Sequence, residues 1–388
     1  MKLLILLLIF SIPFFSFSQV SNPEFRWKTQ EISKDNNLQG MSIHDENTAV
    51  IAGYGRTFKI TNNKGISWND VGLLNPKYHY NDISITDNVG YIAGRKTMLI
   101  KNPTGGEEDV FVNGVLLKTS DNGATWSQLD LSKIGEGSDP GINPNAKGSI
   151  ALNPFMVLSI SNSKSMIFMH WFDVISGTKK PHSAVFKTND GGAKWTVITQ
   201  DFGGAYVNAM KKFGSDIYIG GNKILLKASS ENDIVTDLFP AFSSVAGSTA
   251  FINEIRSFKE NELHVVTMAG VFISADGGKT FSKLSGSTGG NDFFRLDDKT
   301  MIALGASSAS KATIDGGVTW VSCYPGKTIW DIPGVFNDSL YALATSTVYK
   351  MAVSDLKAGN YKWVSKTLIQ GNSILQKMYL SDGKTTLV

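Results

Sequence analysis

Short apolar runs alternate with glycine-rich and polar joints along most of the chain. The pattern is clearest in residues 48–61 (TAVIAGYGRTFKIT), 89–101 (VGYIAGRKTMLIK), 215–228 (SDIYIGGNKILLKA) and 261–274 (NELHVVTMAGVFIS). Runs of this length, bounded by turn-forming residues, are typical of β-strands joined as hairpins. Each of these segments therefore predicts two neighbouring strands of a sheet.

An octet of residues with a shared pattern occurs five times. It reads Ser/Thr-x-Asp/Asn-x-Gly-x-x-Trp/Phe and lies at 61–68, 119–126, 188–195, 274–281 and 313–320. Asp and Asn side chains accept hydrogen bonds from nearby backbone N–H groups, glycine permits a positive φ, and the aromatic residue buries a large apolar area. Catalysis or metal binding by these acids is the alternative, but repetition favours structure. We predict structural turns built on Asn63, Trp68, Asp121, Trp126, Asp190, Trp195, Asp276, Phe281, Asp315 and Trp320.

The spacing of the octets predicts the architecture. The intervals from Phe281 to Trp320 and from Trp320 to Trp363 match a propeller blade of about 40 to 45 residues. The interval from Trp195 to Phe281 is twice as long, which places a degenerate octet near residues 227–239. We expect an all-β fold, a single β-propeller of seven blades with four antiparallel strands each, with six or eight blades as alternatives. Residues 26–32 and 374–388 are expected to close the ring or to begin an eighth blade.

The N-terminal residues predict export. Lys2 precedes an apolar run of about 14 residues, which Ser16 and Ser18 follow, as in a cleaved secretory signal peptide. The run is shorter than the roughly 20 residues that span a bilayer, so we expect no membrane-spanning segment after cleavage. We therefore predict a signal peptide at 1–18 and a propeller at 19–388, exported to a bacterial periplasm, cell surface or medium. Cys323 is the single cysteine, so no disulfide forms within the chain.

The octets resemble the Asp-box (BNR) repeat. Together with the segments at 51–68 (IAGYGRTFKITNNKGISW) and 219–228 (IGGNKILLKA), they are most similar to the photosystem II assembly and stability factor family, which has non-photosynthetic members. The resemblance implies a β-propeller, but a fold does not define a chemistry. The net charge of +3 without a basic run argues against nucleic acid as a partner.

An enzymatic function stays open as the second hypothesis. Asp-box sialidases clamp a carboxylate with three arginines, but FRWK at 25–28 lacks the Ile-Pro of their first arginine motif. Other glycoside hydrolases need two carboxylates, for which the candidates are Asp82, Glu107, Glu108, Asp109, Asp173 and Asp331. The five histidines show no metal-ligand spacing, so we expect neither a metal nor another cofactor.

The connections on the face opposite the octets are expected to carry function. Residues 102–114, 130–149 and 170–183 read as long loops there, and long loops on a rigid scaffold usually serve binding. We expect a non-enzymatic binding or assembly module for an envelope or extracellular protein or a surface glycan, with a glycan-active hydrolase as the alternative. The candidate face comprises Tyr54, Arg56, Tyr78, His79, Arg95, His170, Trp171, His182 and Trp330.

Overall fold

A computed structural model describes most of the chain after residue 37. The described residues are 38–43, 49–53, 58–63, 67, 69–71, 78–101, 107–135, 144, 150–175, 178–305, 309–326, 329–336, 338–344, 347–361 and 363–367. They belong to one compact unit, Glu31–Val388. The predicted signal peptide and the predicted closing strands at 26–32 and 374–388 lie outside the described residues.

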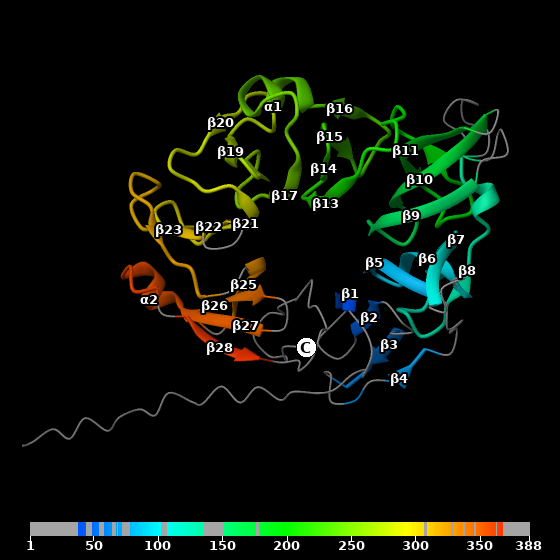
Figure 1. Ribbon diagram of the computed structural model, residues 1–388, viewed down its shortest axis with the longest axis horizontal. Helices are drawn as coiled ribbons and strands as arrows, with labels where there is room; N and C mark the ends of the chain where they lie inside the picture. Colours follow the sequence, from blue (N-terminus) through cyan, green and yellow to red (C-terminus); the bar gives the residue numbers. More distant parts are fainter. Residues whose placement is uncertain are drawn as a thin grey trace, which may run out of the picture. The chain divides into compact units, whose positions relative to one another are not determined.

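The described residues form seven sheets of four consecutive antiparallel strands, which confirms the predicted seven-bladed β-propeller (Figure 1). Blades 1 to 3 comprise β1 (Leu38–Ile43), β2 (Ala49–Gly53), β3 (Phe58–Thr61), β4 (Asn69–Asp70); β5 (Tyr78–Thr86), β6 (Val89–Lys101), β7 (Glu107–Thr119), β8 (Ser127–Gln128); and β9 (Ile150–Ser159), β10 (Ser165–Ile175), β11 (Thr178–Thr188), β12 (Thr196–Val197).

Blades 4 to 7 follow in the same order along the chain (Figure 1). They comprise β13 (Val207–Phe213), β14 (Asp216–Gly221), β15 (Ile224–Ser229), β16 (Val235–Asp237); β17 (Ile252–Arg256), β18 (Leu263–Thr267), β19 (Gly270–Ser274), β20 (Ser282–Lys283); β21 (Gly290–Arg295), β22 (Met301–Gly305), β23 (Lys311–Thr313), β24 (Val321–Ser322); and β25 (Ile329–Phe336), β26 (Ser339–Ala344), β27 (Thr347–Ala352), β28 (Val364–Thr367).

The described residues include three short helices in the connections between strands. The 3-10 helix η1 (Leu131–Lys133) follows β8, and α1 (Phe239–Ala246) links blades 4 and 5. In blade 7, α2 (Val353–Lys357) occupies the third-to-fourth connection, where the other blades carry an octet. Among the described residues, no helix has both the length and the apolar character needed to cross a bilayer.

Antiparallel order gives each blade two distinct ends. The first-to-second and third-to-fourth connections lie at one end, which we call the octet end. The second-to-third connections and the links between blades lie at the other, which we call the loop end. Contacts between blades align these ends: Lys164 of blade 3 pairs with Glu231 of blade 4, and Lys259 of blade 5 pairs with Asp298 of blade 6, all in octet-end turns.

Apolar cores between successive blades hold the sheets together. Between blades 2 and 3 the core includes Tyr91, Ile167, Trp171, Phe186 and Trp195, and equivalent clusters join each later pair. Because most blades are covered on both faces, strands such as β14 and β18 are almost wholly buried. Burial of apolar surface, at about 25 cal/mol per Å², is the main term that stabilises this packing.

A β-bulge or register shift recurs in the first strand of every blade. In four blades the bulged residue is an asparagine. Asn208 donates to the carbonyl of Ile252 at 3.0 Å, and Asn253 donates to the carbonyl of Gly290 at 2.7 Å. Each of these amides therefore links the first strand of one blade to the first strand of the next.

Two of the three segments expected as long loops are strands. Residues 107–114 continue β7, and residues 170–183 form most of the β10–β11 hairpin. The expectation was wrong there because extended ladders pair these residues across their hairpins, as His170 pairs with Ser183 and Trp171 with His182. Of residues 130–149, the described part begins with the short helix η1.

Candidate functional site

The octets share one hydrogen-bond pattern. In the second blade, Gly123 N donates to Thr119 Oγ1 at 2.8 Å, Thr119 Oγ1 donates to Asp121 Oδ1 at 2.8 Å, and Thr125 N donates to Asp121 Oδ1 at 2.8 Å. The same contacts recur around Asp190, Asp276 and Asp315. Bonds from Thr319 and Thr313 lower the pKa of Asp315 to about 2. These carboxylates accept hydrogen bonds from the backbone and hydroxyl groups of their own turns.

The octet aromatic residues point back into the blades. Trp126, Trp195 and Phe281 are buried in the cores between blades, whereas Trp320 is only partly buried. The indole of Trp126 donates to the carbonyl of Gly123 at 2.9 Å. Trp68 lies outside the described residues, whereas Asn63 accepts from Ser67 N at 2.9 Å in the first blade's octet.

The degenerate octet lies in blade 4, at the β15–β16 turn. Ser229 Oγ accepts from the backbone N–H groups of Glu231 and Asn232, and Asn232 Oδ1 accepts from Ile234 N. The buried Lys187 of blade 3 donates to this turn, at 2.7 Å to the carbonyl of Asn232 and 2.9 Å to Asp233 Oδ1. Side-chain oxygens still accept hydrogen bonds from backbone N–H groups in this turn, but they belong to other residue types. The octet pattern is therefore not recognisable in the sequence of blade 4.

The residues expected on the binding face separate into three groups. Tyr54 and Arg56 lie outside the described residues, and of Trp330 only the backbone, in β25, is described. His79 and Arg95 are direct cross-strand partners near the loop end of blade 2. Tyr78 precedes them, and its hydroxyl lies 3.2 Å from Gln128 Oε1. All three side chains are partly exposed, but Tyr78 packs against Tyr80 on the face of the sheet opposite the His79 and Arg95 pair.

The third group comprises His170, Trp171 and His182, which were expected at the surface but are buried. Trp171 is 1% exposed, and it stacks on the His182 ring at 5.4 Å and 11°. His182 Nδ1 lies 2.6 Å from Asp201 Oδ2, and its Nε2 lies 3.2 Å from Asp173 Oδ2. His170 points to the other face of the sheet, where burial lowers its pKa to about 4. Side chains along β10 and β11 alternate between the two faces of the sheet, and both faces are covered by neighbouring blades. The rings of His170, Trp171 and His182 are therefore buried and form no open surface.

The described carboxylates of the first strands are engaged in holding blades together. Asp82 Oδ2 accepts from Val157 N at 3.1 Å. Asp292 receives Arg256 in a two-bond contact at 2.9 and 2.6 Å, and it accepts from Ile332 N at 2.7 Å. In the described part of the chain, His, Cys, Asp and Glu side chains form no group of three or more that could hold a metal ion.

Three exposed apolar side chains lie at the loop end of blades 4 and 5. Tyr206 is 54% exposed, Phe251 40% and Met268 58%. The Tyr206 ring contacts Phe155 of blade 3 at 6.1 Å between centroids. We call Phe155, Tyr206, Phe251 and Met268 the apolar stripe. These residues belong to no shared motif, so no sequence pattern indicates the stripe.

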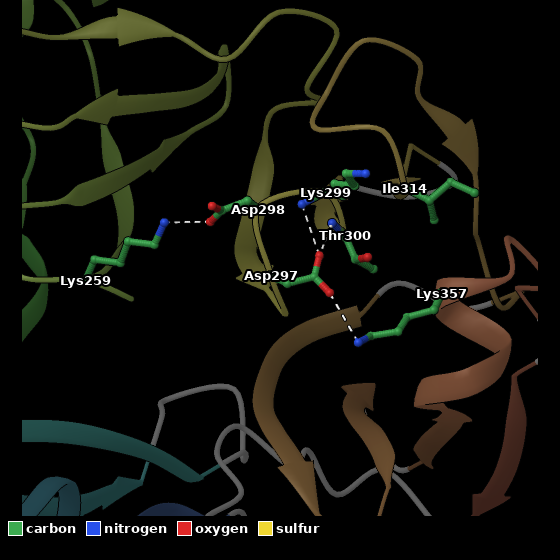
Figure 2. Close-up of a pocket in the computed structure, with 7 residues that line it drawn as sticks. All are labelled: Lys259, Asp297, Asp298, Lys299, Thr300, Ile314 and Lys357. Atoms are coloured by element: carbon green, nitrogen blue, oxygen red, sulfur yellow. Dashed lines mark hydrogen bonds and ion pairs between the residues drawn. The ribbon is translucent and has the colours of Figure 1, made fainter.

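The octet end is charged instead. A depression of roughly 610 Å³ in this end of blades 5 to 7 is lined by Lys259, Asp297, Asp298, Lys299, Thr300, Ile314 and Lys357 (Figure 2). Its charges largely pair with one another, Lys259 with Asp298 at 2.6 Å and Lys357 with Asp297 at 3.3 Å. Asp297 also accepts from the backbone N–H groups of Lys299 and Thr300. The depression therefore offers a hydrated, internally neutralised surface.

Comparisons with known proteins agree on the fold. No family model matches the chain. The photosystem II assembly lipoprotein Ycf48 of Synechococcus sp. (strain CC9902) is 23% identical over 197 residues, which are 50% of this chain and 46%, about half, of that protein. A structure described as YCF48 bound to D1 peptide is 17% identical, with a TM-score of 0.50 over 82% of this chain and 93% of the other. YCF48 from Cyanidioschyzon merolae is 15% identical, with a TM-score of 0.52 over 83% of this chain and 98% of the other. The chain is thus a β-propeller that resembles the photosystem II assembly factor Ycf48 in sequence over half of its length and in fold over most of it.

Proposed function

We propose that this chain is a non-enzymatic assembly module that binds a protein partner through its loop end. The observation that carries the proposal is the apolar stripe, because exposed aromatic and methionine side chains gathered at one end of a rigid scaffold are typical of protein recognition. The relative seen with a D1 peptide supports a protein as the class of partner. The expected signal peptide makes an envelope or extracellular protein the partner we propose.

The geometry favours binding over glycan hydrolysis. A glycosidase needs two carboxylates about 5 to 10 Å apart that face the substrate. Asp82 and Asp173, two of the expected candidates, are buried, and Asp82 accepts a backbone hydrogen bond while Asp173 faces His182. The side chains of Glu107, Glu108, Asp109 and Asp331 lie outside the described set. A surface glycan remains the alternative partner, and the test below separates it from a protein.

The test compares two triple variants of the mature chain. The first carries Tyr206→Ser, Phe251→Ser and Met268→Ser at the loop end. The control carries Ile234→Ser, Val318→Ser and Val321→Ser, which are 66%, 83% and 55% exposed at or beside the octet end. Both sets remove exposed apolar side chains, so we expect both variants to fold with little change in stability.

Each variant is used to capture partners from the envelope fraction of the producing cell. We expect a protein that the wild type and the octet-end control retain and that the stripe variant loses. Equal retention by all three would contradict the proposal. Retention of envelope polysaccharide, without protein, would indicate that the chain binds a glycan and not a protein.

A further inference from the structure

We infer that the apolar stripe binds an extended, uncharged peptide segment whose apolar side chains lie against Tyr206, Phe251 and Met268. This inference rests on the proposed function and specifies the chemistry of its partner.

The stripe is continuous across three blades. Tyr206 O accepts from Asn222 N at 2.8 Å, and Asn222 forms an antiparallel bridge with Phe251. Two residues later, the Asn253 amide lies 3.4 Å from the Met268 sulfur. Successive sheets pack about 10 Å apart, so a stripe over three blades extends roughly 20 Å. An extended segment of about six residues covers that distance, whereas a helix of the same length covers roughly half of it.

The loop end around the stripe carries almost no charge. The links at 238–251 and 284–289 and the turn at 267–270 contain no Asp, Glu, Lys or Arg. The charges nearest the stripe lie at its edges: Lys223 in the turn at 221–224, Lys283 beside the turn at 267–270, and Asp201, which is bonded to His182, with the exposed Lys179 and Lys180 on the blade 3 side. His170 lies 4.5 Å from the Tyr206 ring, and its pKa of about 4 keeps it neutral near pH 7.

The octet end of blades 4 to 6 is charge-dense. Its turns contain Glu231, Asp233, Lys259, Glu260, Glu262, Asp276, Lys279, Asp297, Asp298, Lys299 and Asp315. A charged group lying against Tyr206, Phe251 and Met268 would lose hydration, with ion partners only at the edges of the stripe, and this cost is large for any charge that becomes buried. The difference between the two ends therefore selects an uncharged occupant for the loop end.

The backbone that carries the stripe is closely packed. A Cβ atom added to Gly221 would lie 2.0 Å from Tyr206 O, and one added to Gly289 would lie 1.8 Å from Met268 O. The backbone at Tyr206 and Met268 thus packs directly against Gly221 and Gly289, where no larger residue fits without a shift. A fixed backbone lowers the entropy lost on binding, while the flexible Met268 side chain adapts to differing apolar groups.

The experiment uses random dodecapeptides displayed on phage as the probe. Peptides are selected on the mature wild-type chain and counter-selected on the Tyr206, Phe251 and Met268 triple serine variant. The dissociation constants of synthetic copies are then measured at about 50 mM and about 500 mM NaCl. They are also measured with Met268→Lys and with the matched octet-end variant Val318→Lys.

We expect the selected peptides to carry apolar residues without charged ones. Their affinity should change by less than about twofold between the two salt concentrations, because no ion pairs form. Met268→Lys should weaken binding about tenfold or more, and Val318→Lys should leave it unchanged. Melting curves establish that both lysine variants remain folded.

Two results would overturn the inference and separate it from the proposed function. Charge-rich peptides that bind the stripe and weaken about tenfold in high salt would refute the uncharged occupant and leave a protein-binding loop end in place. If selection yields no stripe-dependent peptide, the inference fails. If envelope capture is in addition equal for all variants, the proposed function fails with it.

Discussion

Asp292 offers the sharpest test of how the blades are joined. Its carboxylate lies on the first strand of blade 6, is almost fully buried, and binds Arg256 of blade 5 and the backbone N–H of Ile332 in blade 7. Arg256 Nη2 also lies 3.3 Å from the carbonyl of Ile332. The pair therefore links three blades, and Asp292→Ala removes its centre.

The magnitude of this change follows from what Asp292→Ala leaves behind. Arg256 keeps its charge in a mostly buried position without its carboxylate, and Ile332 N loses its acceptor. Removal of one partner from a buried ion pair costs about 3 to 5 kcal/mol of unfolding free energy. Asp292→Asn keeps an acceptor but removes the charge, so we expect a smaller loss.

Asp298→Ala is the matched control. Asp298 also pairs with a blade 5 cation, Lys259 at 2.6 Å, but both side chains are exposed to solvent. Urea titrations of the three variants, followed by tryptophan fluorescence, give the differences in unfolding free energy. We expect Asp292→Ala to lose several times more than Asp298→Ala. Equal losses would refute the assignment of Asp292 as the buried centre of the joint.

Three further predictions follow from the described contacts. First, burial lowers the pKa of His170 to about 4 and that of His264 to about 3, below the value of about 6.5 in the unfolded chain, so the unfolded state binds more protons between these values. Stability is then complete above about pH 6.5 and falls by a few kcal/mol per histidine toward pH 4, and His264→Leu should flatten this pH dependence in urea titrations; an unchanged slope would contradict the burial argument. Second, Gly192→Ala places a Cβ 2.8 Å from Tyr91 Oη at a φ of +93°, so it should cost about 1 to 3 kcal/mol, whereas Gly203→Ala, which also has a positive φ but no atom within 4 Å, should cost less. Third, Asp315→Ala should lower the melting temperature and leave partner capture by the folded chain unchanged; lost capture at an unchanged melting temperature would contradict a purely structural octet.

The repeat made the architecture predictable. Five octet turns place an aromatic residue directly before the fourth strand of their blade, so the interval from Phe281 to Trp320 gives the length of one blade. The same arithmetic located the degenerate turn of blade 4, where Ser229 and Asn232 supply the hydrogen bonds. The hydrogen bonds of an octet turn join residues two to four positions apart, so a short sequence pattern is enough to predict the turn.

The binding surface was harder to predict because it depends on contacts between blades. Trp171 is aromatic and close to a presumed loop, but the β10–β11 ladder turns it into the core between blades 2 and 3. Tyr206, Phe251 and Met268 lie far apart in the sequence and meet only through the turns at the loop end. The first-strand asparagines at 81, 208, 253 and 291 did form a sequence signal, Asn followed three times by an acid, which a search of the repeat units would have found.

The most direct test of the central claim is site-specific photo-cross-linking in the producing cell. The photoreactive amino acid benzoylphenylalanine replaces Tyr206 in one full-length variant and Val318 in the other. Mass spectrometry then identifies the attached segment of the partner. We expect a protein adduct at position 206, with an uncharged apolar segment at the cross-link, and no equivalent adduct at position 318. An adduct confined to position 318, or the same adduct at both positions, would contradict it.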